Sequence, residues 1–232
     1  MSVREIEYQD ANLHRVALDV LCGDIVVLKR AVNPSLVRSA VSELNHWAEI
    51  EPQSKKHPRD CGGASHLISY LPARSESRYI AHDFLIQPLY NAPIVSRVMP
   101  VFDVLRDIYN GLLGEKFDFG QDYDGFSFLP QVIQYPRGGG FFQEHFHPIN
   151  PQKIGLVLAG SEYGSDFTIG GGRFRSHDGT WVSTEGSHQI GDVSLFRFDI
   201  GHDITPIDPE YPLDWSKTDG RWSFVLPLKR SG

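Results

Sequence analysis

The sequence has few of the residues that build disulfide frameworks or basic binding surfaces. Its 232 residues include two cysteines, Cys22 and Cys61, and neither belongs to a CxxC pair. Two isolated cysteines do not make a disulfide framework. No run of Lys and Arg is longer than two residues, and the formal net charge is -7. This balance argues against nucleic acid and against an anionic membrane surface as the main partner.

Long apolar runs are also missing. No segment has the length and apolar character needed to span a bilayer. The first residues, MSVREIEYQD, lack the apolar stretch of a signal peptide. We therefore expect a soluble, cytoplasmic protein that does not bind membranes. Apolar residues nevertheless make up 41% of the chain and aromatic residues 12%, so a packed core is expected.

The N-terminal half contains a short apolar strand pattern and two helical patterns. The strand is expected over residues 25–28, and Asn33 and Pro34 then provide a cap and a first turn for a helix. Apolar residues continue from there at helical spacing. A second helix is predicted between Ser96 and Leu113, where Pro100 is expected to delay or kink its start.

From Phe117 onward the pattern changes to short strands separated by turn residues. Examples are GFSFL, QVIQY, IGLVLAG, DVSLFRF and RWSFVLPL, with Gly, Asp, Ser and Pro between them. Many short strands of this kind indicate a sandwich or barrel. We predict one domain over residues 1–232, mainly β with flanking helices (α+β). Its strand and helices occupy about 1–116, and its β core occupies about 117–232.

The stretch FFQEHFHP places two histidines where a strand core would normally have apolar residues. Side chains alternate along a strand, so His145 and His147 share one face, and Glu144 and Phe146 point to the other. Two imidazoles on one face suit a divalent first-row metal ion. The alternative is one core histidine and one exposed histidine, because short patterns of this kind also occur by chance.

A third histidine, His202, follows the apolar strand VSLFRF, in a turn bounded by Gly201 and Pro206. Taken alone, it reads as an exposed turn residue. Together with His145 and His147, it is a candidate third ligand. A histidine at the end of a strand distant in sequence could complete a metal site at the open end of a jelly roll.

The last strand pattern, GRWSFVLPL, contains a candidate carboxylate site. Arg221 and Ser223 are two residues apart and share a face, opposite Trp222 and Phe224. A guanidinium beside a hydroxyl on an inward face forms a fork that matches a carboxylate. The alternative is a surface arginine in an edge strand.

The order of these parts resembles the Fe(II)/2-oxoglutarate-dependent oxygenase superfamily. YPRGGGFFQEHFH is similar to the strand that enters its HxD or HxE motif, GDVSLFRFDIGHDITPI to the strand before its distal histidine, and RWS to its RxS motif. The resemblance implies a double-stranded β-helix, or jelly-roll, core packed against N-terminal helices. It implies Fe(II) bound by His145 and His202, with 2-oxoglutarate bound by Arg221, Ser223 and Tyr135.

The implied function is a dioxygenase that uses dioxygen to hydroxylate or desaturate a small molecule, such as an amino acid or a natural-product intermediate. The reaction is coupled to decarboxylation of 2-oxoglutarate to succinate and CO₂. The protein then positions the substrate and excludes water, while the cofactor carries the chemistry.

The chain departs from this family where the carboxylate ligand is expected, because His147 stands there. The simplest ligand set is His145, His147 and His202. One alternative leaves His147 unbound and a coordination position open. Another recruits Glu144 or Asp203, which requires a bulge because each neighbours a ligand in sequence. A second departure is the long loop DPEYPLDWSKTD between His202 and the RWS motif.

Two other functions remain open. GGFFQEHFH also resembles the first motif of cupin metalloenzymes, although the glutamate expected a few residues later is missing and the RxS motif has no role there. A jelly-roll module that binds a ligand or partner without metal is the third possibility. Metal content separates this module from the two enzymes, and succinate release separates the oxygenase from the cupin.

Overall fold

The computed structural model of the protein describes residues 1–70 and 78–230. The helices in these ranges are α1 (Leu13–Leu21), α2 (Pro34–Ile50) and α3 (Pro93–Leu113), with short 3-10 helices at Tyr8–Asp10 and Pro58–Cys61. The first strands are β1 (Val3–Glu7), β2 (Ile25–Lys29), β3 (Ala64–Tyr70), β4 (Tyr79–Ile86) and β5 (Phe126–Phe128). The middle strands are β6 (Gln131–Pro136), β7 (Gly140–His145), β8 (Ile154–Ala159), β9 (Gly171–Arg175) and β10 (Trp181–Ser183). The last strands are β11 (Val193–Arg197), β12 (His202–Ile207), β13 (Gly220–Val225) and β14 (Leu228–Arg230).

Twelve strands form one sheet that folds back on itself. Its order is β1-β2-β11-β8-β13-β6-β4-β7-β12-β9-β10, with β3 also paired to β4. From β6 to β13 the strands alternate between the half β11-β8-β13-β6 and the half β7-β12-β9-β10, except that β10 follows β9 in the same half. Strand β4 joins the two halves because it pairs with both β6 and β7. This arrangement is that of a double-stranded β-helix, and it confirms the predicted mainly-β fold with flanking helices.

Helix α2 begins where the sequence predicts it. Asn33 keeps an extended backbone, and its side chain accepts a hydrogen bond from the Ser35 backbone N–H at 2.9 Å. Pro34 occupies the first turn, where its missing N–H has no intrahelical partner to lose. Local capping chemistry is therefore enough to locate this helix start.

Helix α3 begins earlier than the sequence predicts. It starts at Pro93 rather than Ser96, and Pro100 lies inside it without delaying its start. Pro93 favours the first turn, and the buried apolar face of α3 packs along the sheet, so tertiary packing outweighs the local cost of Pro100. In the described part of the chain, no helix is long and apolar enough to cross a membrane.

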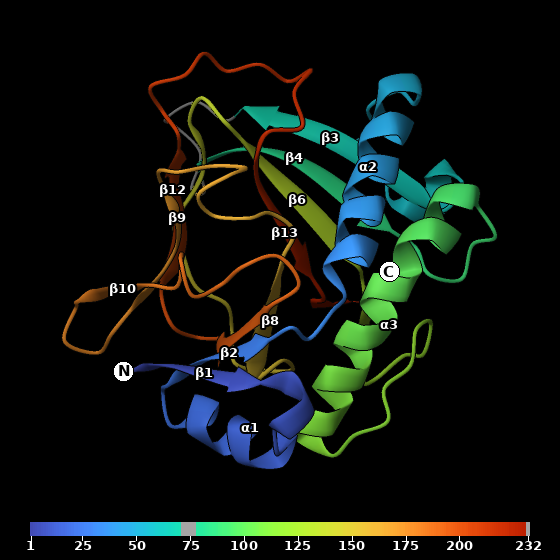
Figure 1. The fold of residues 1–232 in the computed structure, drawn as a ribbon. Coiled ribbons are helices and arrows are strands. Elements are labelled where there is room, and N and C mark those ends of the chain that lie inside the picture. Colours follow the sequence, from blue (N-terminus) through green and yellow to red (C-terminus); the bar gives the residue numbers. More distant parts are fainter. Residues whose placement is uncertain (71–77, 231–232) are drawn as a thin grey trace.

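The main core lies between the helices and one face of the sheet. Helices α2 and α3 lie on the opposite side of β13 from β9 and β12 (Figure 1). The rings of Phe102 in α3 and Phe224 in β13 have centroids 5.8 Å apart in this core. Trp222 is buried in the same core, so the alternate residues Arg221 and Ser223 face the space between the two halves of the sheet.

Candidate metal centre

Strands β7 and β12 bring two of the predicted histidines together. They pair antiparallel with His145 directly opposite His202, and the register shifts just beyond this pair. The centroids of the two imidazole rings are 4.2 Å apart. His147 follows the end of β7, and its backbone N–H donates to the Phe198 carbonyl at 3.3 Å. A pairing between strands that lie far apart in the sequence thus creates the cluster.

The three imidazoles form a set that fits a metal ion. One ring nitrogen from each of His145, His147 and His202 lies within 4.8 Å of the others. In residues 1–70 and 78–230, no other group of three or more His, Cys, Asp or Glu side chains meets this criterion. Three imidazole nitrogens at this spacing are a donor set for a divalent first-row metal ion. The structure thus brings the three predicted ligands together, and their binding of metal stays a prediction.

Backbone carbonyls orient two of the rings. His145 Nδ1 lies 3.0 Å from the Gln143 carbonyl, and His202 Nδ1 lies 2.9 Å from the Ile200 carbonyl. Each Nδ1 must carry the proton to donate, which leaves the Nε2 lone pair available. Metal-binding histidines commonly use such a bond to fix the tautomer and the ring direction.

Phenylalanine rings enclose the cluster. Phe142 stacks on His145 with centroids 3.9 Å apart, and Phe198 stacks on His147 at 4.3 Å. Burial, together with the neighbouring His145 imidazole, lowers the pKa of His147 to about 4 and that of His202 to about 3. Burial also lowers the pKa of His145. All three rings are therefore neutral at neutral pH, the form that binds a metal ion.

The nearby carboxylates point away from the cluster. Glu144 pairs with Arg175 at 3.0 Å, and Asp203 pairs with Arg173 at 2.6 Å. Phe146 is 76% exposed, as expected for the outer face. The alternative ligand sets that use Glu144 or Asp203 therefore require these ion pairs to break.

The predicted carboxylate site is assembled as well. Strands β13 and β6 place Arg221 opposite Tyr135, and Arg221 Nη1 donates a hydrogen bond to the Ser223 hydroxyl. All three residues are buried. Burial raises the pKa of Tyr135, so its hydroxyl keeps its proton. Arg221 is therefore an interior residue rather than a surface arginine in an edge strand.

One residue of this site was missed by the sequence reasoning. Glu185 Oε1 accepts a hydrogen bond from Arg221 Nε at 2.9 Å, and both side chains are nearly inaccessible to solvent, at 6% and 5% exposed. Glu185 lies in the turn after β10, separated from Arg221 by 36 positions. Neither its spacing nor its neighbours in the sequence indicates this contact.

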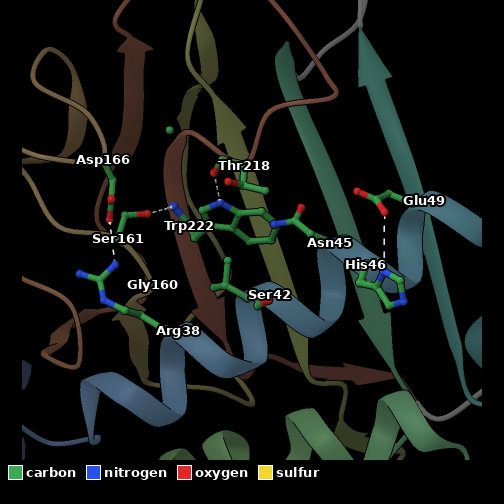
Figure 2. Close-up of a pocket in the computed structure, with 12 residues that line it drawn as sticks. Arg38, Ser42, Asn45, His46, Glu49, Gly160, Ser161, Asp166, Thr218 and Trp222 are labelled. Carbon is green, nitrogen blue, oxygen red and sulfur yellow. Dashed lines mark hydrogen bonds and ion pairs between the residues drawn. The ribbon is translucent and has the colours of Figure 1, made fainter.

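A separate cavity of about 390 Å³ lies on the helix side of the sheet, between α2 and β13. Figure 2 shows the Trp222 indole facing Asn45 of this helix, with Arg38 paired to Asp166 at 3.7 Å. None of the six predicted site residues lines this cavity. The histidine cluster and the cavity are therefore separate sites, with the histidines on β7 and β12 in one half of the sheet and the cavity against β13 in the other half.

Comparisons with known proteins give a likeness of fold. No family model matches the chain, and no curated protein matches its sequence. A prolyl-4-hydroxylase from Pseudomonas putida is similar in structure, with a TM-score of 0.57 and 19% identity over 95% of this chain and 100% of that one. An oxidoreductase of the 2OG-Fe(II) oxygenase family from Burkholderia pseudomallei has a TM-score of 0.53 and 11% identity over 100% and 96% of the two chains.

A third similar structure is a prolyl hydroxylase from Trichoplax adhaerens, in complex with a peptide fragment of the hypoxia inducible factor oxygen degradation domain. Its TM-score is 0.54 and its identity 12%, over 92% of this chain and 89% of that one. The structural neighbours are thus 2-oxoglutarate Fe(II) oxygenases, and the resemblance seen in the sequence is confirmed at the level of fold.

Proposed function

We propose that this protein is a non-haem iron, 2-oxoglutarate-dependent oxygenase that hydroxylates or desaturates an organic substrate. The observation that carries the proposal is the cluster of three imidazoles with ring nitrogens within 4.8 Å of one another, two of them with Nδ1 bonded to a backbone carbonyl. The cluster lies at the ends of β7 and β12, in a fold shared with 2-oxoglutarate Fe(II) oxygenases. A neutral, oriented nitrogen donor set in a largely apolar wall is suited to hold iron.

The residues of the chain would hold and orient the reacting groups. Iron and 2-oxoglutarate, when bound, supply the oxidant that converts a C–H bond and dioxygen to an alcohol, with release of succinate and CO₂. His145, His147 and His202 would be the iron ligands. With His147 in place of a carboxylate, the ligand set is neutral, and the ion keeps one more unit of positive charge. Phe142 and Phe198 keep water away from the rings on which they stack.

Arg221 and Ser223 would bind the distal carboxylate of 2-oxoglutarate. The guanidinium is buried, lies beside a hydroxyl, and donates a hydrogen bond to the carboxylate of Glu185. This contact supports the proposal, because a carboxylate of this chain already pairs with the guanidinium. Tyr135 lies opposite Arg221 and would contribute a neutral hydroxyl to the same site.

For the substrate we propose a small molecule, such as an amino acid or a natural-product intermediate. A peptidyl proline is the second candidate, because two of the structural neighbours are prolyl hydroxylases and one of them is bound to a peptide fragment. Assays with free amino acids and with proline-containing peptides, run in parallel, separate the two substrate classes.

The proposed function is tested by reconstituting the protein with Fe(II) under anaerobic conditions and then adding 2-oxoglutarate and dioxygen. We expect succinate to form catalytically, at a rate raised by a true substrate and abolished in His145→Ala. Oxygen consumption without succinate would point to cupin-type chemistry instead. Failure to bind any metal would point to a binding module.

A further inference from the structure

Glu185 is bound to the guanidinium of Arg221. Its Oε1 atom accepts hydrogen bonds from Arg221 Nε at 2.9 Å and from the Gly172 backbone N–H at 2.6 Å. Arg221 Nη1 is engaged by Ser223. The guanidinium therefore already has a carboxylate partner within the chain, in the interior of the β-helix.

The glycine turn at the start of β9 is shaped around this side chain. A Cβ atom added at Gly171 would lie 2.2 Å from Glu185 Cγ, and the φ angle of Gly171 is +124°. A Cβ atom at Gly172 would lie 3.4 Å from Glu185 Oε1. At Gly171, only a residue without a side chain leaves the room that Glu185 fills, whereas a Cβ atom at Gly172 would make an ordinary contact with it. Glu185 is thus a built-in part of the site.

The neighbouring hydrogen bonds hold the segment of Glu185 in place. The Glu185 backbone N–H donates to the Ser183 hydroxyl at 3.3 Å, and this hydroxyl donates to the Gly172 carbonyl at 3.2 Å. Strand β10 pairs with β9 up to Ser183 and Arg173. The carboxylate is therefore anchored two residues beyond a paired strand.

The charges of the buried pair are balanced. Arg221 brings one positive charge and Glu185 one negative charge, and both side chains are almost completely shielded from solvent. A second carboxylate placed on Arg221 would leave an excess negative charge in a poorly solvated site, beside a like charge. Like charges at contact distance repel strongly where water does not screen them.

We propose that Glu185 determines specificity for the cosubstrate. Its carboxylate competes with the distal carboxylate of 2-oxoglutarate for Arg221. This inference rests on the proposed function. The carboxylate of Glu185 weakens the binding of 2-oxoglutarate, and it has no such effect on a 2-oxo acid that lacks a second carboxylate.

The test compares 2-oxoglutarate with pyruvate, which shares the 2-oxo acid group and has no distal carboxylate. Both are titrated calorimetrically into anaerobic, Fe(II)-loaded protein, so the readout is binding rather than turnover. The variant Glu185→Gln keeps an oxygen to accept both hydrogen bonds and removes the charge. We expect it to bind 2-oxoglutarate about tenfold or more tightly than the wild type, because one like charge is gone. Pyruvate binding should change by less than about twofold.

The wild-type protein provides a second measurement that does not depend on the folding of a variant. With Glu185 on Arg221, the distal carboxylate contributes little, and 2-oxoglutarate should bind within about tenfold of pyruvate. A wild-type preference for 2-oxoglutarate of about a thousandfold would overturn the inference and leave the proposed function standing. An equal gain for both acids in Glu185→Gln would overturn it too. Absence of binding by either acid to iron-loaded protein would overturn both the inference and the proposed function.

Discussion

At the scale of single residues, His147 is the most distinctive feature of the candidate metal centre. Its ring lies 5.1 Å from that of His145 and 5.3 Å from that of His202, measured between centroids, and it stacks on Phe198. Unlike the other two rings, it makes no hydrogen bond to a carbonyl within the described residues. It is therefore the candidate ligand whose ring direction is held least firmly.

We predict that His147→Asp retains bound iron. An aspartate at this position supplies an oxygen ligand and one negative charge, both of which suit a divalent iron centre. Iron content per chain after anaerobic loading is the measurement, and His14→Asp, at an exposed site on α1, is the matched control. Complete loss of iron in His147→Asp alone would contradict a simple exchange of ligands.

The buried pair of Arg221 and Glu185 gives a prediction about stability. Arg221→Met leaves the Glu185 carboxylate buried without its cation, so the free energy of unfolding should fall by about 3–5 kcal/mol. Adding Glu185→Gln to this variant removes the unpaired charge and should restore part of the loss. Urea denaturation of the two single variants and the double variant measures the coupling. Losses that simply add would show that the two side chains do not depend on each other.

The contrast between the histidines and Glu185 shows what could be predicted from the sequence. The period of two residues in a strand predicts that His145 and His147 share one face, and His202 follows the turn after VSLFRF. The structure corrects two details: β7 ends at His145, before His147, and His202 is the first residue of β12 rather than part of a turn, because it pairs with His145. No comparable rule applies to Glu185. Its position depends on the pairing of β9 with β10 and on the room left by Gly171, which are properties of the folded chain.

At the scale of elements, the long loop between β12 and β13 is anchored at its first residue. Asp208 is completely buried, and its carboxylate accepts hydrogen bonds from the backbone N–H groups of Thr168 and Ile169 and from Arg137. Burial alone would raise the pKa of Asp208, but these hydrogen bonds outweigh it and hold the pKa below its ordinary value. The loop is thus tied to the turn that precedes β9.

We predict that Asp208→Ala lowers the free energy of unfolding by about 2–4 kcal/mol at neutral pH, because two backbone N–H groups lose their partner. Because the pKa of Asp208 is lowered in the folded state, its contribution is complete above the ordinary pKa of about 4 and is lost as the pH falls below it. Denaturation at pH 7 and at pH 3 tests both statements. Asp214→Ala, at an exposed position in the same loop, is the control and should change stability much less than Asp208→Ala.

The elements that were hardest to predict depend most on tertiary contacts. The start of α2 and most of the strands after residue 126 follow from local signals in the sequence. Strands β3 and β4 do not, although β4 joins the two halves of the sheet. Polar residues such as His66, His82 and Asp83 interrupt their apolar pattern. His66 and His82 hydrogen-bond to each other at 2.8 Å, so pairing in the folded state satisfies groups that make the sequence look like a loop.

At the scale of the whole molecule, buried histidines make stability depend on pH. His188 is 1% exposed, and its Nε2 atom hydrogen-bonds to the Asp192 carbonyl at 3.0 Å. Burial lowers its pKa from 6.5 to about 4, and burial with the His66 imidazole lowers that of His82 to about 3. Asp83 contributes to the pH dependence of stability with the opposite sign, because burial raises its pKa to about 6.

We predict that the free energy of unfolding rises between pH 4 and pH 6.5. A histidine whose pKa is lowered by folding binds its proton more readily in the unfolded chain, so its contribution is complete above 6.5 and is lost as the pH falls towards 4. For His188 this amounts to roughly 3 kcal/mol. The free energy of unfolding, measured by chemical denaturation at several pH values in this range, should rise less steeply with pH for His188→Gln than for wild type. An unchanged slope, equal to that of the exposed-site control His14→Gln, would contradict the assignment.

The fold of the whole chain is shared with proteins that are at most 19% identical to it among the three compared. A jelly roll fixes which positions face inward, and different apolar side chains can fill those positions. Fold alone therefore leaves the chemistry to a few interior side chains. In this chain we propose that they are the three histidines, Arg221 and Glu185. That residues 1–232 form one domain stays a prediction.

Binding of iron is the most direct test of the central claim that three imidazoles form a metal centre. The measurement is equilibrium dialysis of wild type, His145→Ala and His202→Ala against Fe(II) under anaerobic conditions, with iron and protein determined in each sample. The predicted result is one iron ion per wild-type chain and almost none in either variant, with all three proteins folded. A wild type that binds no iron, or a His202→Ala variant that binds as much as the wild type, would contradict the account.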